Sequence, residues 1–184
     1  KPTSGKVIFN GKDVTRLPTY ARARLGMAIK FQAMQVFQEL SVYQNLFIPL
    51  RRHYKPRDIS AQAKSLLNQL HLEGTEEVTV GDLSHGQQQW LAIGMSLAAE
   101  PTLLLLDEPM AGMNLEEKED MCRFILDANQ QFSITVVLIE HDMGVVMDIS
   151  DRVAVLDYGR KIADGPPESV RNNQKVIDAY LGAN

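Results

Sequence analysis

The chain is poor in cysteine and has no long apolar run, and both absences limit what it can be. Cys122 is the one cysteine among 184 residues, so no disulfide forms within the chain, which fits a reducing compartment. We expect its thiol on the apolar side of a helix. The longest apolar stretches, Leu91–Ala99 and Leu103–Leu106, fall far short of the roughly 20 residues of a membrane-spanning helix. No secretory signal opens the chain, so we expect any membrane role to be peripheral.

An excess of positive charge is also missing. The chain has 19 basic and 23 acidic residues, for a formal net charge of −4. Nucleic-acid binders are normally basic, so we expect no nucleic-acid partner. The 45% hydrophobic content excludes wholesale disorder. The length suffices for one compact domain, possibly with a small inserted lobe.

A phosphate-binding loop of the form G-x-x-x-x-G-K-[ST] is absent as well. The two Gly-Lys pairs, Gly5-Lys6 and Gly11-Lys12, are followed by Val7 and Asp13, which supply no hydroxyl for Mg²⁺. Neither pair has a glycine five residues before its own glycine. The chain opens at Lys1 without an initiator methionine and runs straight into a strand pattern, so we expect further sequence upstream.

The second half of the chain alternates short apolar runs with helical patterns, which predicts an α/β fold with a parallel sheet. In the first half, Asn10-Gly11 predicts a hairpin turn, and a mostly helical middle follows, about 36–100. The expected strands are Met27–Phe31, Thr102–Leu106, Thr135–Ile139 and Val153–Leu156, with the second and third buried. The expected helices are Pro18–Leu25, Ile59–Leu70, Ser84–Ala99, Leu115–Gln131 and Asp142–Ile149.

Two carboxylates follow the strand Thr102–Leu106, at the sheet edge where open α/β proteins bind ligands. Asp107 suits Mg²⁺, directly or through water, beside a phosphate chain. Glu108 suits the orientation or deprotonation of an attacking water. The plain alternative is a strand that ends in polar loop residues.

The run Leu83-Ser84-His85-Gly86-Gln87 opens a helix. Its hydroxyl and backbone N–H groups form an end that binds anions well, and Gly86 lets a ligand approach the backbone. The alternative is a plain serine-capped helix.

Three further polar residues lie at similar positions. His141 follows the strand Thr135–Ile139 and, if the strands are parallel, shares the edge of Asp107, where an imidazole can bond a phosphate oxygen or water. Gln32 also ends a strand, and its amide can contact a metal or water. Asn114 follows the carboxylates by a short turn. The alternatives are a structural role for His141, a plain surface position for Gln32 and a helix cap for Asn114. A cap at Asn114 is compatible with a functional role.

The order and spacing of these residues resemble the nucleotide-binding subunit of an ATP-binding-cassette (ABC) transporter. Leu83–Gln87 matches the signature motif, and Leu103–Asp107 matches the Walker B strand with Glu108 at the catalytic glutamate. The remaining matches are Gln32 at the Q-loop, Ala111, Gly112, Met113 and Asn114 at the D-loop, and His141 at the switch histidine. The resemblance covers essentially the whole chain.

The resemblance implies a P-loop NTPase (RecA-like) fold with a parallel-sheet core, N-terminal antiparallel strands and an inserted α-helical signature subdomain. Residues 1–184 would be one ABC ATPase domain without its P-loop part. Within it, 1–35 would be a remnant of the first strands, 36–100 the helical subdomain with the signature motif, and 101–184 the rest of the core.

In the family mechanism, two such subunits face head to tail and hold ATP and Mg²⁺ between them. The resemblance makes Glu108 and His141 catalytic, Asp107 and Gln32 metal-contacting, and Leu83–Gln87 a nucleotide-binding segment acting in trans. It implies permease subunits that dock near Gln35–Pro49, an indirect periplasmic solute-binding partner, and a peripheral place on the cytoplasmic face of the inner membrane.

A finer resemblance is to the ATPases of branched-chain amino-acid importers, although importers of urea and amides share much of the pattern. The stretches that support it are Gln35–Leu46, Glu108–Asn114, Gly165–Val170 and Ala179–Gly182. Two substitutions depart from the family. Trp90 replaces a common basic residue, which indicates either extra packing or a changed partner contact, and His85 replaces the commoner glycine.

The missing P-loop indicates either a cropped protein or a natural loss, and we expect the chain alone neither to bind nor to hydrolyse ATP measurably. Two other functions compete with the importer ATPase. A DNA-repair or translation ATPase is disfavoured by the acidity and by the helical lobe between Gln32 and Ser84. A non-catalytic scaffold is supported only by the missing loop, and retention of Glu108 and His141 argues against it.

Overall fold

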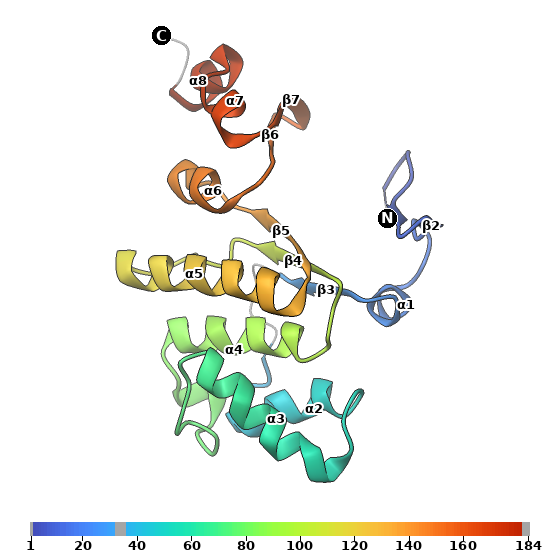
Figure 1. The fold of residues 1–184 in the computed structure, drawn as a ribbon, viewed down its shortest axis with the longest axis vertical. Coiled ribbons are helices and arrows are strands. Elements are labelled where there is room, and N and C mark those ends of the chain that lie inside the picture. Colours follow the sequence, from blue (N-terminus) through green and yellow to red (C-terminus); the bar gives the residue numbers. More distant parts are fainter. Residues whose placement is uncertain (1, 32–35, 182–184) are drawn as a thin grey trace. The chain divides into compact units, whose positions relative to one another are not determined.

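The computed structural model describes residues 2–31 and 36–181, and the chain divides into two compact units, Lys1–Val137 and Leu138–Asn184 (Figure 1). Each unit is described by itself below. Within the described ranges, no helix is both long and apolar enough to cross a membrane.

The first unit begins with the expected hairpin. Strands β1 (Ile8–Phe9) and β2 (Lys12–Asp13) pair antiparallel, and the turn between them has positive φ at both Asn10 (47°) and Gly11 (75°). These angles are those that a two-residue turn requires, and they explain the Asn-Gly sequence. Helix α1 (Thr19–Arg24) follows as expected.

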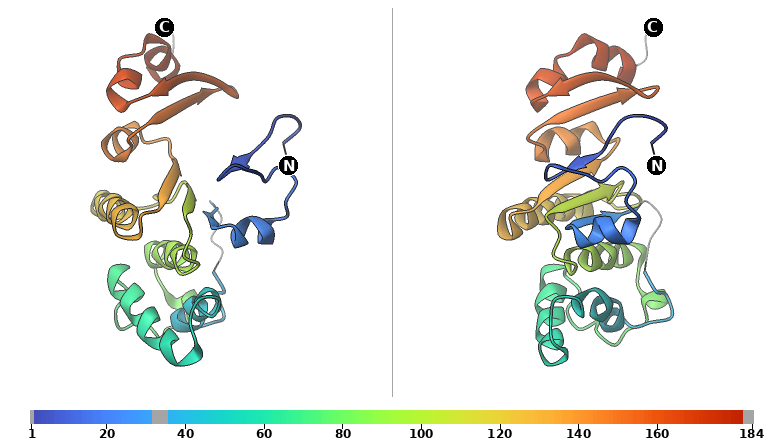
Figure 2. Two further views of the ribbon diagram at one scale, coloured as in Figure 1. Left: turned by 45° about the vertical axis from the view of Figure 1, so that its right-hand side comes forward. Right: turned by 90° about the vertical axis from the view of Figure 1, so that its right-hand side faces the viewer.

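A three-stranded sheet lies at the centre of the first unit, in the order β3 (Met27–Lys30), β4 (Leu103–Asp107), β5 (Thr135–Ile139), and the last two residues of β5 fall in the second unit. Strands β3 and β4 run parallel, as predicted. Leu104 and Leu106 are 2% and 1% exposed. Helices α4 (His85–Leu97) and α5 (Leu115–Phe132) lie along the sheet (Figure 2).

The prediction that β5 is buried is wrong. Val137 and Ile139 are 45% and 59% exposed, while the residues that alternate with them are half-buried. β5 is the last strand in the sheet order, and alternate side chains of a strand point to opposite faces. An apolar run of five residues therefore did not indicate burial on both faces here.

The helical middle lies between β3 and β4 in the sequence. It contains α2 (Val42–Leu50), α3 (Pro56–Gln69), the short 3₁₀ turn η1 (Val80–Asp82) and α4. Pro56 begins α3 at a position where the missing N–H costs nothing. The fully buried side chains of this region include Leu46, Leu67, Leu70 and Leu91.

The second unit contains α6 (Met143–Ile149), β6 (Val153–Asp157), β7 (Arg160–Gly165), α7 (Pro167–Arg171) and α8 (Gln174–Leu181). The alternation of the sequence suggested β6 as a further strand of a parallel series, but it pairs antiparallel with β7. The turn Tyr158-Gly159, with φ of 43° and 76°, folds the chain back at once. Val153, Ala163, Val170 and Val176 form the buried cluster of this unit.

Candidate functional site

The signature segment, Leu83–Gln87, forms the N-terminal end of α4. Ser84 is the N-cap, and its Oγ accepts a hydrogen bond from the Gln87 N–H at 3.2 Å, while Gln87 Oε1 accepts from the Ser84 N–H at 3.0 Å. The predicted cap is confirmed as a capping box. Helix geometry leaves the N–H groups of His85 and Gly86 directed out of the helix start, where an anion is stabilised.

Two buried glutamines follow the signature segment, and no sequence pattern indicated their roles. Gln88 Nε2 donates to the carbonyls of Val80 (3.1 Å) and Leu83 (3.0 Å), and its Oε1 accepts from Gln38 Nε2 at 3.2 Å. Gln89, only 2% exposed, lies with its Nε2 3.4 Å from His85 Nε2. The first two turns of α4 are thus fixed by side-chain amides.

The signature segment also contacts the loop 111–114 and the start of α5. A Cβ atom at Gly86 would lie 3.0 Å from Glu117 Oε1, so position 86 has little room for a side chain. A Cβ atom at Gly112, where φ is 77°, would lie 3.4 Å from His85 Cδ2. The structure therefore brings together two segments that the sequence separates by more than twenty residues.

Asp107 ends β4, and Glu108 is the first residue beyond it. Glu108 has a φ of 43°, in the left-handed region that non-glycine residues seldom adopt. Such strained residues cluster at functional sites. Pro109 and Met110 are buried immediately after, and the Ala111 N–H donates to the Glu108 carbonyl at 3.3 Å. The chain thus turns sharply where it presents the two carboxylates.

Asn114 caps α5. Its Oδ1 accepts from the Glu117 N–H at 3.0 Å, and Glu117 Oε2 accepts from the Asn114 N–H at 2.9 Å. The structural alternative for Asn114 is therefore confirmed, and it leaves a functional role open. The spacing Asn-x-x-Glu was the sequence signal that could have identified Glu117 as its partner.

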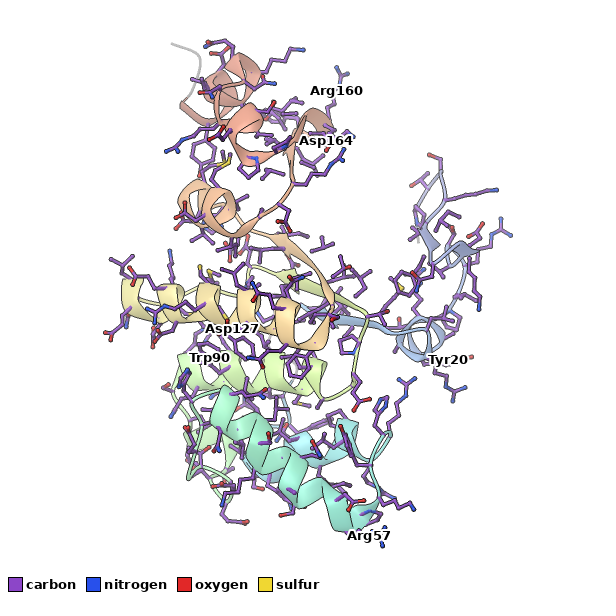
Figure 3. All side chains as sticks on the ribbon, in the orientation of Figure 1. Tyr20, Arg57, Trp90, Asp127, Arg160 and Asp164 are labelled. Atoms are coloured by element: carbon purple, nitrogen blue, oxygen red, sulfur yellow. The ribbon has the colours of Figure 1, made fainter. Side chains whose placement is uncertain are left out.

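Trp90 is buried against α5, at 8% exposure. Its ring meets Phe124 edge to face, with centroids 5.2 Å apart, and His71 in the same manner at 6.0 Å. Figure 3 shows Trp90 directed from α4 toward the helix that bears Asp127. Of the two interpretations of Trp90, the structure shows packing.

His141 belongs to the second unit, and its side chain is 78% exposed. Its Nδ1 lies 3.8 Å from Glu140 Oε2, and its backbone carbonyl accepts a hydrogen bond from the Tyr180 hydroxyl. Asp142 caps α6 by accepting from the N–H groups of Gly144 and Val145. The approach of His141 to Asp107 stays a prediction.

A metal site is the least defined part of the candidate site. Within the described ranges, no three His, Cys, Asp or Glu side chains are grouped to hold an ion. Gln32, the second expected metal contact, lies outside the described residues. The carboxylate of Asp107 is nevertheless the kind of oxygen ligand that Mg²⁺ takes when substrate phosphates and waters supply the rest.

The fold and these motifs agree with comparisons to known proteins. Residues 1–111 match the ABC transporter family, and residues 160–184 match the branched-chain amino acid ATP-binding cassette transporter family. The chain belongs to the ABC transporter family, as an ATP-binding domain.

Among curated proteins, the chain is 34% identical to the high-affinity branched-chain amino acid transport ATP-binding proteins BraF of Pseudomonas aeruginosa and LivG of Escherichia coli K12. Each alignment covers 99% of this chain and 78% of the relative. The spermidine/putrescine import ATP-binding protein PotA of Clostridium novyi is 33% identical, over 98% of this chain and 52% of PotA.

Solved structures give the same result. MJ1267 in its ADP conformation, an ATP-binding cassette of an ABC transporter, superposes with a TM-score of 0.82 at 27% identity, covering 98% of this chain and 78% of that one. CbiO1 of Clostridium perfringens, part of an ABC transporter complex, has a TM-score of 0.82 at 28% identity. The superposition covers 96% of this chain and 71% of CbiO1. The expected fold, a P-loop NTPase of the ABC type, is confirmed.

Proposed function

We propose that the intact protein is the ATP-binding subunit of an ABC importer and couples ATP hydrolysis to uptake of branched-chain amino acids or related small solutes. The observation that supports this most is the arrangement in the first unit. There, the strained Glu108 follows β4, and the capped signature segment packs on the same loop that joins Glu108 to α5. The names of BraF and LivG and the match of residues 160–184 support the solute class.

The proposed roles follow from the chemistry of each group. Asp107, with Gln32, would hold Mg²⁺, which would neutralise charge on the phosphates, and Glu108 would orient and deprotonate the water that attacks the γ-phosphate. His141 donates a hydrogen bond to that phosphate. The N–H groups at the start of α4, with the Ser84 hydroxyl, bind the nucleotide of a second ATPase subunit, and loop 111–114 lies beside them.

The proposed partners are a second ATPase subunit, permease subunits and, indirectly, a periplasmic solute-binding protein. The permease would dock near Gln35–Pro49, of which the described part begins at Val36. This segment contains exposed Phe37 and Ile48, at 52% and 47%. Apolar side chains in this setting suit a protein contact. The subunit would lie on the cytoplasmic face of the inner membrane.

The decisive test is Glu108→Gln in the full-length protein. We expect ATP binding to be kept and turnover to fall by about a hundredfold or more, because the amide cannot take a proton from water. Radiolabelled ATP binding and phosphate release measure the two effects. Glu77→Gln, at an exposed carboxylate of the first unit, is the control. Unchanged turnover in Glu108→Gln would remove this residue from catalysis.

We further propose that the 184-residue chain by itself neither binds nor hydrolyses ATP measurably. A P-loop supplies several donors to the phosphates, and the loss of three charged hydrogen bonds costs about 4–9 kcal/mol, or roughly 10³–10⁶ in affinity. Isothermal titration with ATP should show no binding in the micromolar range. Micromolar binding would contradict the proposal.

A non-catalytic scaffold is the second candidate, favoured by the lack of G-x-x-x-x-G-K-[ST] in the chain. It predicts that Glu108→Gln and wild type behave alike in the full-length protein, so the same assay separates the two functions.

A further inference from the structure

Tyr180 lies in α8, close to the end of the described chain, and its hydroxyl donates a hydrogen bond to the backbone carbonyl of His141, 39 positions earlier. Both residues belong to the second unit. The bond is specific to the phenol, because phenylalanine would fill the same space without a donor. Tyr180 thus reaches the segment that the proposed function makes catalytic, through its backbone.

A second set of hydrogen bonds lies next to this carbonyl in the chain. On one side, the Asp142 carboxylate accepts from the N–H groups of Gly144 and Val145, at 3.1 and 3.4 Å, and so sets the start of α6. The hydrogen bond from Tyr180 orients the peptide plane between His141 and Asp142. Backbone angles restrict side-chain rotamers, so this plane limits where the imidazole can point.

Helix α8 is itself anchored, although the Tyr180 side chain is 56% exposed. Val176 is 3% exposed in the buried cluster of this unit, against which Met143 and Met147 of α6 also pack. Ile177 and Tyr180 line a cavity of about 350 Å³ together with these two methionines. The phenol therefore projects from a helix that is anchored in the buried cluster of this unit, and its hydroxyl reaches the residue just before the N-cap of α6.

We infer that Tyr180 is a positioning residue for His141: α8 holds the histidine segment in place by one hydrogen bond to its backbone. The consequence for catalysis rests on the proposed function, whereas the positioning itself does not. This gives a role to part of the C-terminal stretch that matches the branched-chain transporter family.

The first experiment measures the positioning alone. The chain has four histidines, so a ¹⁵N-histidine-labelled sample gives few imidazole signals, and the other three serve as internal references. We expect Tyr180→Phe to shift the signals of His141 and to leave those of His53, His71 and His85 unchanged. Tyr158→Phe, at a fully exposed tyrosine of the same unit, is the matched control. Unchanged His141 signals in Tyr180→Phe would overturn the inference.

The second experiment measures ATP hydrolysis by the full-length protein. We expect Tyr180→Phe to lower kcat roughly fivefold, the worth of one neutral hydrogen bond, with KM for ATP and the melting temperature unchanged. Tyr158→Phe should match wild type. In a His141→Ala background, Tyr180→Phe should have no further effect, because the residue acts through the histidine.

The outcomes separate the two proposals. If Tyr180→Phe lowers kcat by the same factor in the wild-type and the His141→Ala backgrounds, Tyr180 does not act through His141. If Glu108→Gln leaves turnover unchanged, the proposed function fails, while the imidazole signals still decide the role of Tyr180.

Discussion

At the scale of single residues, Asp164 shows how a local charge cluster stabilises the second unit. Its Oδ1 accepts from Arg152 Nε at 2.8 Å and its Oδ2 from Lys161 Nζ at 2.6 Å. These hydrogen bonds lower the pKa of Asp164 from 3.8 to about 2. Figure 3 places the residue on the hairpin with Arg160. The cluster joins β7 to Arg152, the residue just before β6.

The pH dependence of stability follows from the lowered pKa of Asp164. A carboxyl group whose pKa is depressed by folding stabilises the fold at pH above its unfolded value, 3.8, and the effect is lost as pH falls through about 2. We expect wild type to have a larger free energy of unfolding than Asp164→Asn near neutral pH. This gap in free energy should close as the pH falls from 3.8 to about 2.

Urea unfolding of both proteins at several pH values measures the gap. Asp151→Asn, at an exposed aspartate of the same unit, is the control and should show a much smaller gap. Added salt should narrow the gap for Asp164→Asn at neutral pH, since exposed ion pairs are screened. A gap that does not change with pH would mean that lost packing, and not charge, causes it.

At the scale of helices and strands, Trp90 joins the signature helix α4 to α5. We expect Trp90→Ala to lower the free energy of unfolding by about 3–5 kcal/mol, because it removes a buried ring and its edge-to-face contact with Phe124. Trp90→Arg, which restores the residue type common in the family, should also destabilise the chain, since it places a charge against that ring.

Chemical denaturation measures these free energies. The double variant Trp90→Ala, Phe124→Ala should lose less than the sum of the single variants, since the two rings contact each other. Tyr20→Ala, at a tyrosine that is 65% exposed, is the control and should change stability by about 0.5 kcal/mol or less. Strict additivity of the two ring deletions would show that the contact contributes nothing.

At the scale of the whole molecule, one face of the central sheet is apolar and incompletely covered. Met27 and Ile29 of β3 pair in register with Leu103 and Leu105 of β4, and all four are half-buried, while Val137 of β5 is 45% exposed. Parallel sheets in proteins are normally covered on both faces. This surface is therefore a site where the chain is prone to associate.

We expect the isolated 184-residue chain to self-associate through this face. Light scattering as a function of concentration should show association that Val137→Lys weakens. Leu156→Lys is the matched control, because Leu156 is a 70% exposed strand residue of the other unit and the added charge is the same. If Val137→Lys and Leu156→Lys weaken association equally, the added charge causes the effect and the sheet face does not.

Features that depend on neighbours in the chain could be predicted from the residues alone. Asn10-Gly11 predicted its turn, Ser84 its helix start, and the leucine run its strand with two carboxylates beyond it. Each signal spans a few residues, within which backbone preference and hydrogen bonding act directly. The order of these motifs was also enough to indicate the family.

The fold alone sets which distant side chains meet. It buried Gln88 between Gln38 and the Leu83 carbonyl, placed Trp90 on Phe124, left one side of β5 exposed, and brought Tyr180 to His141. These contacts join residues up to 50 positions apart, so they depend on the path of the whole chain. Residue type limits what a side chain can bond, and packing selects the partner among many chemically equivalent ones.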